Sequence, residues 1–141
     1  MQLEIAQKIV AAAIASARSQ KFKPLAIVVL DARGSIKAAA AEDGTSLKRA
    51  EIAIGKAHGA LAMGLGSRTL FSRSQQQPQF MAAVTHAVGG SLIPVPGGVL
   101  INDSARTLLG AVGVSGDTSD NDEIAAMAGI AAAGCKGDPG A

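Results

Sequence analysis

Apolar side chains recur at helical spacing over the first part of the chain. Between Leu3 and Ser19 they return every three or four residues, with polar side chains between them. This period predicts an amphipathic helix with one buried face, which ends before Pro24. A continuous apolar run, Leu25–Leu30, follows. It is short and rich in β-branched residues, and therefore predicts a buried strand.

A second short run, Ser35–Ala41, follows the turn residues Asp31–Gly34. Two runs separated by such a turn predict a β-hairpin. Asp43-Gly44 then interrupts the pattern, and Thr45 or Ser46 can cap a helix. We expect that helix over residues 47–63.

The middle of the chain has a weaker pattern. Pro78 is expected to begin a short helix that runs through His86, because proline is favoured in the first turn of a helix. The stretch before it is predicted to be loosely helical or a loop, and the glutamines at 75–77 are expected to lie in a loop.

The last third predicts two strands and one helix. The strands are expected to end at Ile101 and to span Leu108–Ser115, and the helix is expected over residues 120–133. Neighbouring strands are joined by short turns, which favours an antiparallel sheet over a doubly wound parallel one. The fold class is therefore predicted to be α+β, with four to five antiparallel strands, helices packed on them, and residues 1–141 forming a single domain.

The composition restricts how the core is built. Apolar residues make up 48% of the chain, but aromatic residues only 2%, and tryptophan and tyrosine are absent. A core of alanine, valine, leucine and isoleucine buries little area per side chain. We therefore expect further burial through self-association into a homodimer or a higher oligomer.

Charge and cysteine content exclude several classes of protein. Thirteen basic and eleven acidic residues leave a net charge of +2, and the three phenylalanines are scattered, so no nucleic-acid partner is expected. Cys135 is the only cysteine, which excludes an intrachain disulfide and a cysteine zinc site. The acidic loop before the last helix is interpreted as a helix cap, and no metal site is predicted.

The chain also lacks the pattern of a membrane or secretory segment. No apolar run is long enough to span a bilayer. Glu4 and the absence of a cationic start argue against a secretory signal. A cytoplasmic location without membrane association is therefore expected.

Two glycine-rich segments near the end of the chain predict a binding site. Gly97 and Gly98 follow Pro96, while Ser115 and Gly116 close the last predicted strand. Glycine lets the backbone approach a ligand or another chain closely. We expect these four residues to line a ligand site.

Two cations share one stripe of the predicted helix 47–63. Arg49 and Lys56 lie two turns apart among apolar residues. One interpretation is that they bind a carboxylate, propionate or phosphate, Arg49 as a fork and Lys56 as a point charge. The alternative is that their stems pass along the core, or that they pair with carboxylates of the last helix.

The two histidines, His58 and His86, are candidates for a haem ligand or an acid/base group. A noncovalent haem would need an axial histidine, methionine, cysteine or tyrosine. The alternative interpretations are a surface histidine for His58 and a hydrogen-bonded histidine at a helix end for His86.

Six short segments, in the same order along nearly the whole chain, resemble the GlcG/HbpS family, which also occurs as the C-terminal part of PduO. They are Val28–Gly34, Asp43-Gly44, Ala53–Ala57, Pro96–Val99, Gly110–Gly116 and Asp122-Glu123. The resemblance implies a profilin-like or PAS-like α+β domain that assembles into dimers and higher oligomers. It also implies haem as the typical ligand, and it adds weight to Lys56.

Three functions are compatible with these features. The first is a small-ligand binding protein, with haem as one candidate ligand. The second is an isomerase or lyase acting on a small carboxylate or carbonyl compound, with Lys56 or a histidine moving a proton while glycine amides hold an oxyanion. The third is an oligomeric structural module without chemistry.

Overall fold

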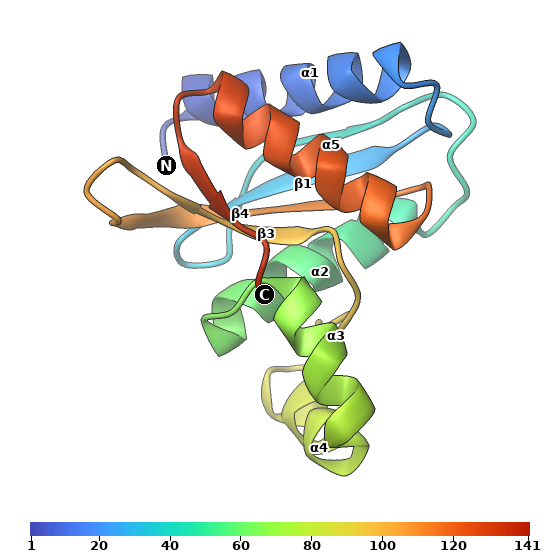
Figure 1. The fold of residues 1–141 in the computed structure, drawn as a ribbon, viewed down its shortest axis with the longest axis vertical. Helices are drawn as coiled ribbons and strands as arrows, with labels where there is room; N and C mark the ends of the chain where they lie inside the picture. The colour runs from blue at the N-terminus through green and yellow to red at the C-terminus, as the bar shows by residue number, and fades with distance from the viewer.

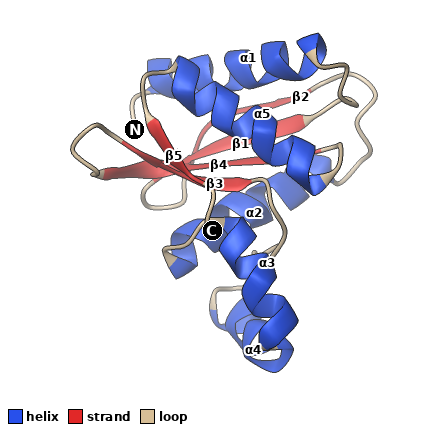
Figure 2. Ribbon diagram, in the orientation of Figure 1, coloured by secondary structure: helices blue, strands red, loops and turns tan.

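Five strands form one antiparallel sheet in the computed structural model, which describes residues 1–141 (Figure 2). The spatial order of the strands is β2-β1-β4-β3-β5. The elements along the chain are α1 (Leu3–Ser19), β1 (Ala26–Asp31), β2 (Ile36–Ala41), α2 (Arg49–Met63), α3 (Ser67–Gln76), α4 (Pro78–Ala87), β3 (Gly98–Asn102), β4 (Leu108–Ser115), α5 (Ser119–Ala132) and β5 (Lys136–Asp138). The predicted α+β class is confirmed.

Helices cover both faces of the sheet (Figure 1). On one face α1 and α5 pack over alternate residues of the strands, among them Ile27, Val99 and Val112. On the other face α2 packs through three alanines against residues such as Val28 and Leu100. The alternation of side chains along each strand therefore places one core on each side.

Close packing of α2 depends on two glycines that face each other across the ladder between β3 and β4. Gly98 is paired with Gly113. A Cβ at Gly113 would overlap the carbonyl oxygen of Ala53, and one at Gly98 would overlap that of Lys56. The backbone of α2 thus lies directly on the sheet, where any side chain at either position would keep it away.

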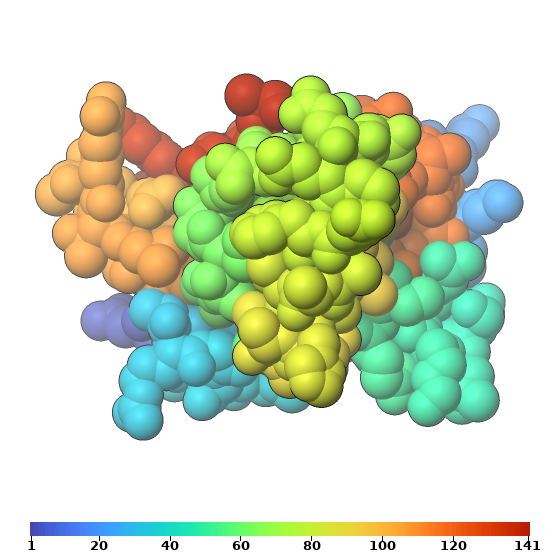
Figure 3. All heavy atoms as spheres, turned by 90° about the horizontal axis from the view of Figure 1, so that it is seen from below, coloured from blue at the N-terminus to red at the C-terminus, as the bar shows by residue number.

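Helices α3 and α4 form a hairpin that extends away from the sheet (Figure 1). Seen from below, it forms a central ridge of the molecule (Figure 3). A small cluster of Leu70, Met81 and Leu92 holds it together. The prediction of a loop at residues 75–77 is wrong, because α3 continues through Gln76 and only Gln77 separates the two helices. Glutamine is a good helix former, and the buried Leu70 anchors an otherwise polar helix.

Strand β5 was not predicted from the sequence. It pairs with β3, with Leu100 opposite Asp138 and Asn102 opposite Lys136. Its side chains have no apolar alternation, so only the backbone ladder defines it. None of the helices combines the length and the apolar character that crossing a lipid bilayer requires.

Candidate functional site

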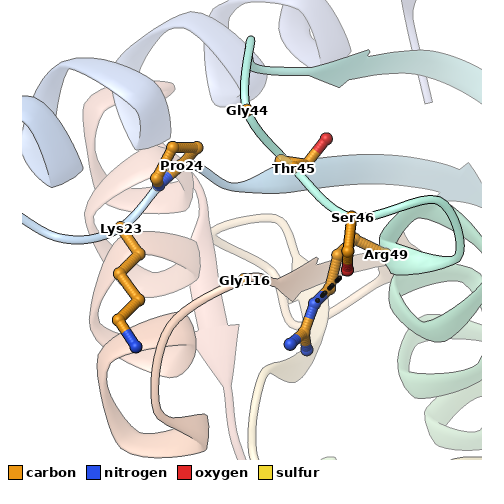
Figure 4. Close-up of a pocket in the computed structure, with 7 residues that line it drawn as sticks. All are labelled: Lys23, Pro24, Gly44, Thr45, Ser46, Arg49 and Gly116. Carbon is orange, nitrogen blue, oxygen red and sulfur yellow. Dashed lines mark hydrogen bonds between the residues drawn. The ribbon is translucent and has the colours of Figure 1, made fainter.

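A small polar hollow lies where the chain enters β1, leaves β4 and begins α2 (Figure 4). Its volume is about 200 Å³, and none of its lining residues is hydrophobic. The lining consists of two cations, two hydroxyl residues, two glycines and a proline: Lys23, Pro24, Gly44, Thr45, Ser46, Arg49 and Gly116. No carboxylate belongs to the lining.

Arg49, the first residue of α2, is oriented by two hydroxyl groups. Its Nε donates to Oγ of Ser46 at 3.2 Å, and its Nη1 donates to Oγ of the buried Ser115 at 3.3 Å. Arg49 forms no ion pair within the chain. Two neutral acceptors therefore fix the guanidinium while its charge stays uncompensated, which favours an anionic ligand.

Lys23 reaches the hollow from the other side of Gly116 (Figure 4). Its backbone N–H donates to Oδ2 of Asp117 at 2.7 Å, which ties the segment before β1 to the turn after β4. That hydrogen bond, together with those from the Thr118 backbone and the Asn121 side chain, lowers the pKa of Asp117. Asp117 thus remains a carboxylate that positions Lys23.

Backbone groups add donors at the same place. The N–H groups of Gly44 and Ser46 donate no hydrogen bond to the backbone of the chain. A Cβ at Gly116 would overlap the carbonyl oxygen of Pro24, so only glycine allows β4 and the start of β1 to meet here. Cations, hydroxyls and amide donors in one hollow form the chemistry of an anion site.

Lys56 lies next to this hollow but inside the protein. Its Nζ donates to Oδ2 of Asp122 at 2.9 Å and to the carbonyl oxygen of Val114 at 2.9 Å, and both side chains of the ion pair are only 2% exposed. Burial lowers the pKa of Lys56 and raises the pKa of Asp122, while the opposite charge of each partner counteracts the shift. The structure therefore places Lys56 in an ion pair with the last helix, which was the alternative interpretation.

The ion pair supports the turn that borders the hollow. Oδ1 of Asp122 accepts a hydrogen bond from the backbone N–H of Asp117 at 3.0 Å. Lys56 and Asp122 are therefore positioning residues for the segment that carries Ser115 and Gly116.

Gly97 and Gly98 face Lys56 and do not line the hollow. A Cβ at Gly97 would lie 2.9 Å from Nζ of Lys56, and the N–H of Gly98 donates to Oγ of the buried Ser67 at 2.7 Å. The structure thus divides the six predicted ligand residues into two groups. Arg49, Ser115 and Gly116 lie at the hollow, while Lys56, Gly97 and Gly98 form the buried cluster beside it.

The two histidines lie apart from the hollow and from each other. His58, on α2, is half-buried, with Nδ1 2.7 Å from the carbonyl oxygen of Ser91. His86 is exposed near the end of α4. Neither of them lines any of the four hollows on the surface.

Five lining residues were not predicted as site residues: Lys23, Pro24, Gly44, Thr45 and Ser46. The signal available for the last three was the Asp43-Gly44 break followed by two hydroxyl residues, which fits a helix cap equally well. No hydrogen bond from a side chain caps the start of α2. The hydroxyl of Ser46 accepts from Arg49 instead.

Comparison with known proteins places the chain near haem-associated proteins. Residues 1–131 match the family model described as haem degrading protein HbpS-like. The structure is similar to PduOC in complex with haem (TM-score 0.82, 23% identity, 94% of each chain) and to HbpS (TM-score 0.79, 26% identity, 93% of this chain and 88% of that one). It is also similar to the ORFY protein of Klebsiella pneumoniae (TM-score 0.83, 23% identity, 94% and 90%). No curated protein matches the chain.

Proposed function

We propose that this chain, which belongs to the family of haem degrading proteins like HbpS, is a small-ligand binding protein whose ligand carries a carboxylate or phosphate group. The observation that supports this proposal is the guanidinium of Arg49. It faces a hollow without any acidic lining residue, and two hydroxyl groups hold it in place. A fixed cation next to a second cation and to the hydroxyl of Ser46 favours binding of an anion over a neutral molecule.

The size of the hollow limits the part of the ligand that it takes. About 200 Å³ is room for an anionic group with a few further atoms, but not for a large planar cofactor. The lining offers no apolar wall to a ring system. The hollow therefore suits a small organic acid, a phosphate ester, or the anionic end of a larger ligand.

Haem is the second candidate ligand, because the family description names haem and a structural neighbour was solved with it. The residues of the hollow do not fit this group. Haem iron needs an axial donor, and the lining holds no histidine, methionine, cysteine or tyrosine. His58 and His86 remain the candidate axial ligands elsewhere in the chain, and Arg49 has no role toward the iron.

We expect the Arg49→Gln variant to bind inorganic phosphate or succinate at least about tenfold more weakly than the unchanged protein, because a charge-assisted hydrogen bond contributes roughly 1.5–3 kcal/mol. Isothermal titration calorimetry at low ionic strength measures this effect. Arg33→Gln, in the exposed turn before β2, is the matched control and should keep the original affinity. Equal affinity of the two variants for both anions would refute the proposal.

A titration with haemin distinguishes the two ligands. If haem is the ligand, a saturable Soret band should appear and weaken in His58→Ala or His86→Ala. If a small anion is the ligand, calorimetry should show phosphate or succinate binding that neither histidine variant changes, since neither histidine lines the hollow.

A further inference from the structure

Lys23 is the second cation of the hollow that Arg49 borders, and no carboxylate pairs with it. The residue is exposed and forms no ion pair within the chain. It reaches the hollow from one side of Gly116, while Arg49 reaches it from the other (Figure 4). With no acidic residue in the lining, two positive charges remain for a ligand to meet. A singly charged anion would compensate only one of them.

Charged groups fix the backbone on both sides of Lys23. Nη2 of Arg18 donates to the carbonyl oxygens of Phe22 at 2.7 Å and of Lys23 at 2.9 Å. Nε of Arg18 pairs with Oε2 of Glu42 at 2.9 Å, and Oε1 of that carboxylate accepts from the backbone N–H of Leu25 at 2.9 Å. The segment that carries Lys23 is therefore already in place at the hollow, and only its side chain loses freedom when a ligand binds.

The carboxylate that follows Gly116 does not compensate Lys23 either. Asp117 accepts hydrogen bonds from the backbone N–H groups of Lys23 and Thr118 and from the Asn121 side chain. These bonds lower the pKa of Asp117 more than the charge of Lys23 does. The ammonium of Lys23 lies outside ion-pair distance of Asp117, so its charge remains available to a ligand.

The hollow offers more hydrogen-bond donors than a carboxylate can use. Arg49 donates only from Nε to Ser46 and from Nη1 to Ser115, so the rest of its guanidinium N–H groups are free. The ammonium of Lys23 and the hydroxyl of Ser46 add further donors. A carboxylate carries a single charge on a pair of oxygens. The terminal phosphate of a monoester carries a charge of about −1.5 to −2 at neutral pH, spread over three acceptor oxygens.

The size and polarity of the hollow favour a compact dianion over a dicarboxylate. Its volume of about 200 Å³ has room for a phosphate group and the first atoms attached to it. A dicarboxylate distributes the same charge over two ends, which are joined by CH₂ groups. These groups would meet no hydrophobic residue in the lining. Two charges on one tetrahedral group therefore match the hollow better.

We propose that the hollow takes the terminal phosphate of a phosphate monoester between Lys23 and Arg49, and that Lys23 sets a preference for a doubly charged group over a singly charged one. This inference rests on the proposed function, because it specifies the ligand of the same hollow. Arg49, which two hydroxyl groups orient, binds the first charge of any anion. Lys23 meets the second charge, which only a dianion brings.

Methyl phosphate and methyl sulfate test this preference, because they have nearly the same shape but carry two charges and one charge at pH 8. Isothermal titration calorimetry of the full chain at low ionic strength should show methyl phosphate binding at least about tenfold more tightly. Lys23→Gln should remove most of this difference, because the second charge then meets no ammonium. The variant should fold, since Lys23 is exposed and its backbone hydrogen bonds remain. Lys21→Gln, an exposed position that lines no hollow, is the control and should keep the difference.

Three results would overturn the inference, and they differ in what they mean for the proposed function. If both esters bind equally and Arg49→Gln weakens both, the hollow is an anion site without a preference for two charges. If Lys23→Gln keeps the full difference between the esters, or Lys21→Gln removes it as well, Lys23 does not set the preference. If neither ester binds to the unchanged protein, the inference and the proposed anion site both fail.

Discussion

The Asp122→Asn variant is expected to lose about 3–5 kcal/mol of its free energy of unfolding, because the change leaves the Lys56 ammonium buried without a counter-charge. Both side chains are 2% exposed, and their nearest atoms are 2.9 Å apart. Water cannot reach Nζ of Lys56 in the native state, so the variant must expose the ammonium or release its proton. Urea unfolding followed by circular dichroism measures the loss.

Two further variants separate this effect from a general sensitivity of α5. Asp120→Asn breaks an ion pair with Arg68 in which the Asp120 side chain is 74% exposed, and it should cost less than about 1 kcal/mol. Adding Lys56→Met to Asp122→Asn removes the unpaired charge and should recover most of the loss. A double variant as unstable as Asp122→Asn would show that the charge is not the cause.

The Gly113→Ala variant should lose at least about 3 kcal/mol of unfolding free energy, or fail to fold, because its methyl group has no room under α2. A Cβ at this position overlaps the carbonyl oxygen of Ala53 and lies 3.2 Å from the Cβ of Ala57. The obstacle is helix backbone, which no rotamer change can relieve. The whole of α2, and with it Arg49, would have to move away from the sheet.

Gly134→Ala is the matched control for this effect. Gly134 has a φ of 76°, but a Cβ there would meet no atom within 4 Å. It should therefore show only the conformational cost of alanine in the left-handed region, about 1–2 kcal/mol. Comparable losses in the two variants by urea unfolding would contradict the close-packing role of Gly113.

The elements that could be predicted are those in which the pattern of apolar and polar residues matches the buried and exposed faces. Helix α1 and strand β4 have the predicted bounds, because apolar residues mark their buried faces from end to end. Strand β5 could not be predicted in this way. Lys136-Gly137-Asp138 has no apolar side chain. Its ladder with β3 and the close approach of Gly137 to Met127 exist only in the folded chain.

The candidate site divides in the same way. Local signals in the sequence marked three of its residues. Arg49 is a cation on an apolar stripe, and Ser115 and Gly116 stand at the end of a predicted strand. Lys23 had none, because Asp117, 94 residues away, brings it to the hollow. The carboxylate that pairs with Lys56 could not be chosen from the four between residues 117 and 123, because the choice depends on how α5 lies on the sheet.

The most direct measurement of anion binding at the hollow is a titration of the ¹⁵N-labelled protein with inorganic phosphate, followed by heteronuclear NMR. The glycine amides act as reporters: Gly44 and Gly116 line the hollow, while Gly64 and Gly134 lie elsewhere. Saturable shifts of Gly44 and Gly116 that Arg49→Gln abolishes are the predicted result. Unchanged Gly44 and Gly116 signals at saturating phosphate, or larger shifts at Gly64 and Gly134, would contradict an anion site at Arg49.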